Sequence, residues 1–493
     1  MPRLALGIDL GTSAVKVALV GEDGAAVAFE RAPHPTRTDL PGQAEQDPAD
    51  WLDALAAALG RLGQRHDLGA VGGIGLAGQL PTLVVLTGEE VAGPAVTWMD
   101  SRADAFAARL LGEAGRRAVY RQTGMRIDGR YLAPMYAYHF ASVGRRAERV
   151  LSAKDWLYLR LTGQVATDPS TAAGYGAFSL AKGAFDPALL APWGMDVGQL
   201  PPVRPSDDRS GRVTAEAARQ LGLPVGVPVA VGAADSTAAA LAVGALAEGT
   251  VAVIPGSSTA VLAAVRRPRL DRRARILVTP HALPGWWGYE ADLLATGASV
   301  SWLARLVGRD ERDLMALAAA VPPGAGGLRW APYLAGGEQG VLWRDDVAGA
   351  VLGLTLRHGA AELARALVEG IAFEVRRTLE AIGRLVGPFD EVALANGHVG
   401  EGDGAVAEAV LAAVLARPVR AIAYESAAAV GAALLAGTTA VDPRHAGALV
   451  AAAGGHTRRL TPDPALAARY EGLYRDHVRT FPRAAALDGG KRP

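Results

Sequence analysis

The feature that most constrains the fold is a short pattern that occurs twice, almost half a chain apart. Gly11-Thr12-Ser13 and Gly256-Ser257-Ser258 each separate two apolar runs. The four runs are residues 4–10, 14–20, 250–254 and 259–265. An apolar run, a tight Gly/Ser turn and a second apolar run together predict a β-hairpin. The turns are offset by 245 residues (256 minus 11) in a chain of 493, which predicts a duplicated architecture.

Strand-like and helix-like segments alternate through the rest of the chain. Helices are expected over residues 48–62, 102–111, 154–161, 298–307, 360–384, 403–416 and 425–436, and strands over residues 71–76, 83–86, 226–231 and 390–394. Interleaved strands and helices predict an α/β fold with mixed or parallel sheets. The length of the chain favours two or more domains.

Composition excludes several classes of function. The 50 Lys and Arg balance the 50 Asp and Glu, so the net charge gives no footprint for nucleic acid or an anionic membrane. The absence of cysteine excludes disulfides, thiolate metal sites and thiol nucleophiles. Asp9 interrupts the N-terminal apolar run, and Pro81 with six glycines interrupts the uncharged stretch 68–88. We therefore expect neither a signal peptide nor a membrane span, and predict a cytoplasmic protein.

The first hairpin carries a candidate phosphate site. Its turn, Gly11-Thr12-Ser13, can direct successive backbone N–H groups at a phosphate, while Lys16 adds a further donor. Asp9 at the end of the first strand can hold the water shell of Mg²⁺. An ordinary hairpin with a polar tip remains the alternative on these residues alone.

A second candidate is Asp235, which follows an expected strand and a small-residue turn in an otherwise uncharged neighbourhood. Asp235 could act as a general base for an alcohol, or simply cap a helix. Asp100 and Glu338 are two further acids, for which a surface or capping charge is the default interpretation. The histidines lack the spacing of a metal site, and no Gly-x-Ser-x-Gly elbow indicates a serine hydrolase.

Several segments together resemble the FGGY carbohydrate kinases, and within them the xylulokinase-like members. These segments are Gly7–Ser13 with Lys16, Ala44–Pro48 with Trp51, Lys154–Gly163, and the long match from Gly349 through Glu362 to Gly370. The matches are colinear from residue 4 to about residue 436. The resemblance implies two duplicated actin-like ATPase (ribonuclease H-like) lobes with a cleft between them.

The resemblance also implies roles for individual residues. Asp235 corresponds to the catalytic base and, with Asp9, is expected near Mg²⁺. Nucleotide contacts are expected at Gly11, Thr12, Ser13, Lys16, Gly256, Ser257, Ser258, Gly297, Asn396 and Gly397. Substrate contacts are expected at Gln79, Leu80, Pro81, Asp100, Asp235 and Ser236. ATP and Mg²⁺ are the implied cofactors.

The chain departs from the xylulokinase pattern at several of these positions. Pro81 stands where those kinases carry a histidine, and Ser236 stands where they carry an asparagine. Met135 and Tyr138 break the first family signature, and the glycine-rich adenosine motif reads Ala395–Gly400. Because proline has no side-chain donor, the contact with a pentulose must differ here.

The expected function is an ATP-dependent kinase for a hydroxyl of a ketose such as D-xylulose. The alternatives are an FGGY kinase for another ketose or polyol, such as ribulose or a sugar alcohol, and a degenerate, non-catalytic sugar-binding homologue. The expected division is an N-terminal lobe over 1–243, a C-terminal lobe over 244–440, and a helical extension and tail over 441–493 that packs on the lobes. Dimerisation is common in the family, although no feature of this sequence demands it.

Overall fold

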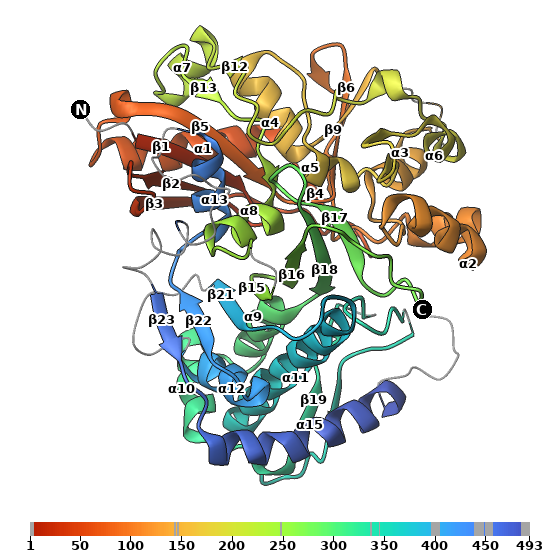
Figure 1. The fold of residues 1–493 in the computed structure, drawn as a ribbon, viewed down its shortest axis with the longest axis vertical. Helices are drawn as coiled ribbons and strands as arrows, with labels where there is room; N and C mark the ends of the chain where they lie inside the picture. Colours follow the sequence, from red (N-terminus) through yellow and green to blue (C-terminus); the bar gives the residue numbers. More distant parts are fainter. Residues whose placement is uncertain are drawn as a thin grey trace. The chain divides into compact units, whose positions relative to one another are not determined.

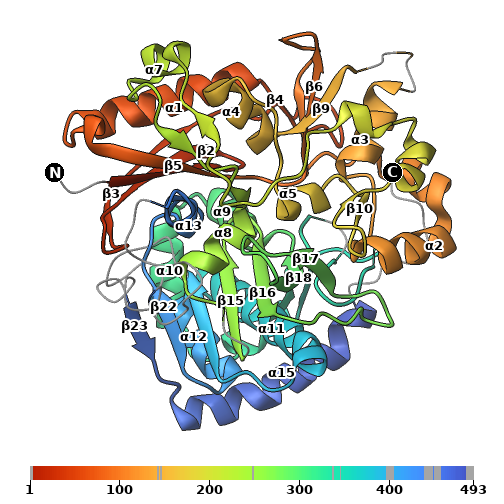
Figure 2. The ribbon, with the colours of Figure 1, turned by 45° about the horizontal axis from the view of Figure 1, so that its top comes forward.

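The computed structural model describes residues 4–141, 144, 147–246, 249–335, 338–344, 346–395, 405–437, 448 and 457–484. The chain forms two compact units. The first unit contains residues 1–246, 264–288 and 426–455, and the second contains residues 247–263, 289–425 and 456–493. Figures 1 and 2 show the elements of each unit.

The first unit is built on a seven-stranded sheet. Its strands, in spatial order, are β12 (Gly211–Arg212), β13 (Pro228–Val229), β5 (Val71–Gly78), β1 (Leu4–Leu10), β2 (Ala14–Val20) and β3 (Ala26–Pro33), and β14 (Ala233–Ala234) also pairs with β5. The pairs β1–β5, β5–β13 and β5–β14 are parallel, whereas β1–β2 and β2–β3 are antiparallel. The predicted first hairpin is confirmed at both of its strands.

Helices cover both faces of this sheet. Helix α1 (Pro48–Gly63) packs on β2 and β3, while α13 (Ala427–Leu435) packs on β1, β2 and β5 from the other side (Figure 2). Leu55, Leu59 and Leu62 of α1 are fully buried, because apolar residues three to four positions apart share one helix face. Asp47 caps this helix through a hydrogen bond from Ala49 N.

Small residues bring α13 close to the sheet. A Cβ atom on Gly7 or Gly75 would collide with the backbone oxygen of Ala429 or Ala432. Helix α13 also packs against α8 (Asp235–Ala242), where Gly431 meets the backbone of Ala238. The backbones of α13, the sheet and α8 therefore approach closely, and this approach depends on glycine at these contacts.

The remaining elements of the first unit form smaller layers. A second sheet contains β4 (Glu45–Gln46), β6 (Thr82–Thr87), β7 (Glu90–Val91), β8 (Ala95–Thr97) and β9 (Arg149–Ser152). The other strands are β10 (Phe178–Ser179) and β11 (Ala184–Phe185), which pair with each other. The other α-helices are α2 (Asp104–Thr123), α3 (Leu132–His139), α4 (Ala153–Thr162), α5 (Pro169–Ala173), α6 (Pro187–Leu190) and α7 (Ala215–Leu221), and 3₁₀ turns occur at Leu68–Ala70, Ala191–Trp193 and Val197–Gln199.

The second unit contains a sheet with the same strand arrangement. In spatial order the strands of this sheet are β17 (Leu277–Pro280), β18 (Trp287–Leu293), β16 (Thr259–Val265), β15 (Thr250–Pro255), β21 (Glu391–Ala395), β22 (Val419–Ile422) and β23 (Thr457–Leu460). Its other elements are α9 (Thr296–Leu306), α10 (Glu311–Ala320), a 3₁₀ turn at Ala325–Gly327, β19 (Arg329–Ala331), β20 (Ala350–Leu352), α11 (Ala360–Val386), α12 (Ala405–Leu415) and α15 (Pro464–Ala484). Helix α11 packs against α9, α10, α12 and α15.

The strand order supports the predicted duplication. Strand β15 pairs antiparallel with β16 and parallel with β21, just as β1 pairs antiparallel with β2 and parallel with β5. In both units a further parallel strand follows, β22 or β13, with an antiparallel strand beyond it, β23 or β12. The two hairpins that the sequence singled out therefore occupy equivalent places in two similar sheets.

Two elements have bounds that differ from those expected, and in each case the difference lies next to a glycine with positive φ. Helix α2 begins at Asp104, and its helical backbone is interrupted at Gly112, where φ is 59°; a further helical segment then continues to Thr123, beyond the expected end at Leu111. Of the strand expected over residues 226–231, only Pro228–Val229 forms a strand, β13; the chain then turns at Gly232, whose φ is 86°, and the short strand β14 follows. Among the described residues, no helix is long and apolar enough to cross a membrane.

Candidate active site

Three candidate functional segments meet at one edge of the first unit's sheet. Asp9 of β1 and Ala233 of β14 both pair with Ala77 of β5. Gln79 directly follows β5, and Asp235 directly follows β14. Since neighbouring strands lie about 4.8 Å apart, the backbones of Asp9 and Ala233 are separated by about 10 Å. The carboxyl ends of parallel strands are the usual place for a ligand in an α/β sheet.

Asp9 is 2% exposed, and among the described residues only one of its two carboxylate oxygens has hydrogen-bond partners. Its Oδ2 lies 3.4 Å from Lys16 Nζ and accepts a hydrogen bond of 3.0 Å from Ser426 Oγ. Its Oδ1 is buried and has no hydrogen-bond partner among the described residues. A buried anionic oxygen without a partner is costly, so this atom is suited to a cation or its water shell.

The first turn is held by its carbonyl groups. The carbonyl of Gly11 accepts from His34 Nε2 at 3.0 Å, that of Thr12 from Gln46 Nε2 at 2.7 Å, and that of Ser13 from His34 N at 3.2 Å. Burial lowers the pKa of His34, which favours a neutral ring. Within the described residues, the N–H groups of Thr12 and Ser13 donate to no protein acceptor. They therefore remain able to bind an anion.

The second turn is held in a similar way within the second unit. The carbonyls of Gly256 and Ser257 accept hydrogen bonds from Gly297 N at 3.2 Å and Ala298 N at 3.1 Å. A Cβ on Gly297 would collide with the oxygen of Gly256. The structure thus brings Gly297 at the start of α9 to the turn Gly256–Ser258. Asn396 and Gly397 lie outside the described residues.

The segment expected to bind the sugar begins at Gln79. Gln79 is 1% exposed, its N–H donates to Leu10 O at 2.8 Å, and its Nε2 donates to Gln46 Oε1 at 2.9 Å. Leu80 packs on Gly174, Pro81 is half-buried, and the Leu80–Pro81 peptide bond is cis. The hydrogen bond to Leu10 places Gln79 next to the end of β1.

Asp100 is a buried carboxylate rather than a surface charge. It is 1% exposed and accepts hydrogen bonds from Ala44 N at 3.0 Å and from Arg102 Nε at 3.0 Å. Burial favours the neutral acid, but the groups around the carboxylate outweigh it, namely His139 at 3.7 Å and the Arg102 guanidinium, and lower the pKa of Asp100 to about 2. The default interpretation was a surface or capping charge, and burial contradicts the surface charge; Oδ1 does accept a local hydrogen bond of 3.0 Å from Arg102 N.

Asp235 is the first residue of α8 and is half-buried. The N-cap residue of this helix is Ala234, so Asp235 lies in the first turn and is not the cap. Its Oδ1 accepts a hydrogen bond of 2.8 Å from the N–H of Ser236, which is also half-buried. A carboxylate at the N-terminus of a helix is stabilised by the helix dipole.

Glu338 is also buried, at 4% exposure, which corrects its interpretation as a surface charge. Its carboxylate accepts hydrogen bonds from Val341 N at 2.7 Å and Trp343 N at 3.0 Å, so its capping role is supported. Burial, followed by the nearby charge of Glu374, raises the pKa of Glu338 to about 7. Glu338 and Glu374 line a pocket of the second unit together with Leu293, Leu294, Ala295, Thr296, Pro332, Tyr333, Ala335 and Gln339.

Several residues that support the site were not predicted. Trp98 Nε1 donates to Thr12 Oγ1 at 3.0 Å, and Ser426 binds Asp9. His34 and Gln46 hold the first turn, although Gln46 belongs to a segment that carries the family resemblance. These contacts join residues far apart in sequence, so no local spacing could have revealed them.

Comparison with known proteins identifies the family. Residues 4–242 match the N-terminal domain of the FGGY family of carbohydrate kinases, and residues 251–440 match its C-terminal domain. The chain belongs to the FGGY family of carbohydrate kinases. This FGGY kinase is therefore an enzyme that phosphorylates a sugar, and the phosphate donor in its family is ATP.

Individual relatives agree with this assignment. The chain is 30% identical to the xylulose kinase of Escherichia coli (strain K12) over 76% of its own length and 78% of that protein. It is 26% identical to the gluconokinase of Bacillus subtilis (strain 168) over 80% of each chain. The crystal structure of xylulose kinase from Rhodospirillum rubrum matches with a TM-score of 0.81 and 31% identity, covering 97% of this chain and 98% of that one. The predicted two-lobed, actin-like fold class is thereby confirmed.

Proposed function

We propose that this FGGY kinase transfers the γ-phosphate of ATP to a hydroxyl of a ketose such as D-xylulose, with Asp235 as the general base. The observation that carries the proposal is the position of Asp235 directly after β14, at the strand edge where Asp9 and Gln79 also lie. The xylulose kinases among the relatives support the choice of sugar. The gluconokinase match makes gluconate the acceptor to test beside it.

The chemistry requires one proton transfer and one phosphoryl transfer. Asp235 takes the proton of the sugar hydroxyl, the hydroxyl oxygen forms a bond to the γ-phosphorus, and the bond to the β–γ bridging oxygen breaks to release ADP. Charge on the phosphate oxygens is stabilised by N–H groups of the first turn and by Lys16. Ser236 N–H orients the Asp235 carboxylate through its bond to Oδ1.

The residues present also fit a magnesium ion. Asp9 Oδ1 is a buried oxygen without a partner among the described residues, and Mg²⁺ is commonly held by one or two carboxylates, water and phosphate oxygens. We propose Asp9, acting through water, and Asp235 as its protein partners. When bound, the ion would neutralise charge on the phosphates.

Two further points belong to the proposal. ATP and a small sugar are cytoplasmic solutes, and the cysteine-free composition suits a reducing compartment, so we place the enzyme in the cytoplasm. We retain a homodimer as the family-based expectation for its oligomeric state, which sedimentation of the purified protein would test.

The decisive experiment measures ADP release with candidate acceptors and the Asp235→Asn variant. D-xylulose, other ketoses, polyols, glycerol and gluconate are compared, and we expect D-xylulose to give the highest kcat/KM. Asp235→Asn keeps an acceptor for Ser236 N–H but cannot take a proton, so kcat should fall by about 10³-fold or more. ATP should still raise the unfolding temperature of the variant.

The matched control is Asp47→Asn. Asp47 is an exposed helix cap, and asparagine caps helices equally well, so activity should stay unchanged. Near-native turnover in Asp235→Asn would remove the general-base role. A higher kcat/KM for another acceptor would make that acceptor the substrate in place of D-xylulose and would leave the proposed mechanism unchanged.

A further inference from the structure

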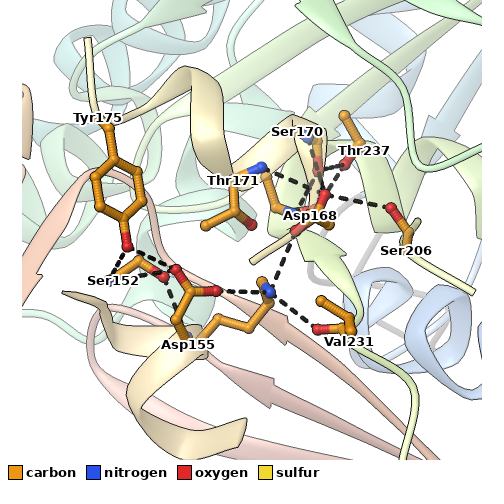
Figure 3. Close-up of polar contacts among 11 residues, drawn as sticks. Ser152, Asp155, Asp168, Ser170, Thr171, Tyr175, Ser206, Val231 and Thr237 are labelled. Carbon is orange, nitrogen blue, oxygen red and sulfur yellow. Dashed lines mark hydrogen bonds and ion pairs between the residues drawn. The ribbon is translucent and has the colours of Figure 1, made fainter. Parts of the chain in front are cut away.

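A buried network of charged and polar residues lies beside the segment that carries Asp235 (Figure 3). We call it the Lys154 network; it consists of Ser152, Lys154, Asp155, Asp168, Ser170, Thr171, Tyr175, Ser206, Val231, Ala234 and Thr237. Every one of its charged side chains is at most 1% exposed. All of its members belong to the first unit.

Lys154 is the cationic centre of the network. Its Nζ lies 3.0 Å from Asp155 Oδ1, 2.9 Å from Val231 O and 3.2 Å from Asp168 Oδ1. Burial lowers the pKa of Lys154, but the adjacent carboxylates of Asp155 and Asp168 outweigh it, so the pKa is raised. The ammonium group is therefore charged at neutral pH. It donates hydrogen bonds to Asp155 Oδ1 and Val231 O and is ion-paired with Asp168 Oδ1.

Ser170 connects Asp168 to the backbone next to Asp235 through hydrogen bonds. Ser170 Oγ lies within hydrogen-bond distance of Asp168 Oδ2 and 3.0 Å from Ala234 N. A carboxylate only accepts, so the single hydroxyl hydrogen of Ser170 goes to Asp168. The lone pairs of Ser170 Oγ then accept the N–H of Ala234, the residue directly before Asp235.

The segment around Asp235 is consequently fixed on both sides. Val231 is held by Lys154 through its carbonyl, and Ala234 is held by Ser170 through its N–H. Thr237 Oγ1 lies 2.9 Å from Ala234 O and 3.3 Å from Ser170 Oγ. Asp235 lies between these contacts, so its backbone position depends on Ser170.

We propose that Ser170, oriented by Asp168 and Lys154, is a positioning residue that holds Asp235 in its reactive geometry. This inference rests on the proposed role of Asp235 as the base. Because a buried ion pair contributes little net stability relative to apolar packing, stability alone does not account for three buried charges at this place. Displacement of a catalytic group by about 1 Å can lower the rate by about 100-fold. A network that fixes the backbone next to Asp235 would therefore keep the rate of catalysis high.

The test compares Ser170→Ala with Ser206→Ala. Both serines are buried and contact Asp168 Oδ2, Ser206 at 3.2 Å. The side-chain hydroxyl of Ser170 also holds Ala234, whereas that of Ser206 contacts Asp168. With D-xylulose, or the acceptor identified by the screen, Ser170→Ala should lower kcat by about 10- to 100-fold, with KM for sugar and ATP within about twofold. Ser206→Ala should lower kcat by less than about threefold.

Calorimetric titration with the sugar supplies the folding control. A binding stoichiometry equal to that of the wild type shows that kcat is measured on folded sites, so a lower kcat cannot reflect loss of protein. If Ser170→Ala does not fold, Thr237→Val is the second variant, since it keeps the side-chain shape and removes the hydroxyl between Ala234 O and Ser170 Oγ. It should lower kcat by about 3- to 10-fold with KM unchanged.

The possible failures are distinguishable. Equal kcat in Ser170→Ala and Ser206→Ala, with Asp235→Asn inactive, would overturn the positioning role and leave the proposed function standing. A rise in KM without a fall in kcat would equally overturn it, because it would place Ser170 in substrate binding. Near-native turnover of Asp235→Asn would instead overturn the proposed function.

Discussion

At the scale of single residues, acids that resemble one another in sequence differ in their surroundings. The carboxylate of Asp100 is engaged by Ala44 N and Arg102, whereas Asp9 keeps one oxygen without a partner among the described residues. The positions of Asp9 and Asp235 at strand ends could be predicted, because apolar runs ending in an acid are visible in the sequence. The hydrogen-bond partners of these acids could not be predicted, because they can be distant in sequence: Ser426 is 417 residues from Asp9.

The low pKa of Asp100 predicts an acid-dependent loss of stability. Its pKa is about 2 in the folded protein and 3.8 as the reference value, so the unfolded chain binds the proton more tightly. The stabilisation is therefore complete above about pH 5 and is lost as the pH falls towards 2. Urea denaturation should show that Asp100→Asn lowers the free energy of unfolding by about 1–2 kcal/mol at pH 6, and by progressively less at lower pH.

The control for this measurement is Asp39→Asn, which changes an exposed side chain of the same unit. It should alter the free energy of unfolding by less than about 0.5 kcal/mol at any pH. A pH-independent difference between Asp100→Asn and the wild type would show that the ionised carboxylate is not the stabilising form.

At the scale of elements, the sequence predicted the strands and helices well where hydrophobic periodicity was unbroken. Helix α11 and both hairpins are examples. The differences lie next to glycines with positive φ, Gly112 and Gly232: a helical segment continues beyond the first, and a further short strand follows the second. At Gly232 a Cβ would also collide with Leu76 O, a contact between segments that sequence periodicity does not encode.

Two glycine substitutions should have opposite effects on stability, because Gly75 lies at the contact between α13 and β5 whereas Gly60 lies on the surface of α1. In Gly75→Ala, the new methyl group would collide with the backbone of Ala432, and a helix backbone cannot rotate away as a side chain can. We expect a loss of about 3 kcal/mol in the free energy of unfolding. Gly60 lies on the exposed face of helix α1 with open space around it, so Gly60→Ala should stabilise by about 0.5–1 kcal/mol.

Chemical denaturation of both variants and the wild type measures these changes. An unchanged midpoint for Gly75→Ala would contradict the close approach of α13 to the sheet. A destabilised Gly60→Ala would show that the helix surface around residue 60 is not open.

At the scale of the whole molecule, the 245-residue offset correctly predicted two sheets with the same strand arrangement. What the sequence could not provide is the grouping of residues 426–455 with the first unit. Helix α13 covers a face of the first sheet although it is encoded near the end of the chain. The packing depends on Gly7, Gly75 and Gly431, and these glycines are indistinguishable in sequence from the many others.

This arrangement predicts that the fragment 1–246 does not fold to a native state by itself. Without α13, the apolar face of β1 and β5 loses its cover, so we expect reduced near-ultraviolet circular dichroism, binding of a hydrophobic dye and rapid proteolysis. Adding a peptide of residues 426–437 should slow proteolysis, while a scrambled peptide should not. Cooperative unfolding of the fragment alone would contradict the prediction.

The late position of α13 also has a consequence for synthesis in the cell. At about 5–20 residues per second, a ribosome needs roughly 20 to 80 seconds between making β1 and making α13. Throughout that time the nascent chain carries a sheet face whose covering helix does not yet exist. The first strands to be synthesised are therefore among the last to be fully packed. The growing polypeptide should depend on chaperones during that interval.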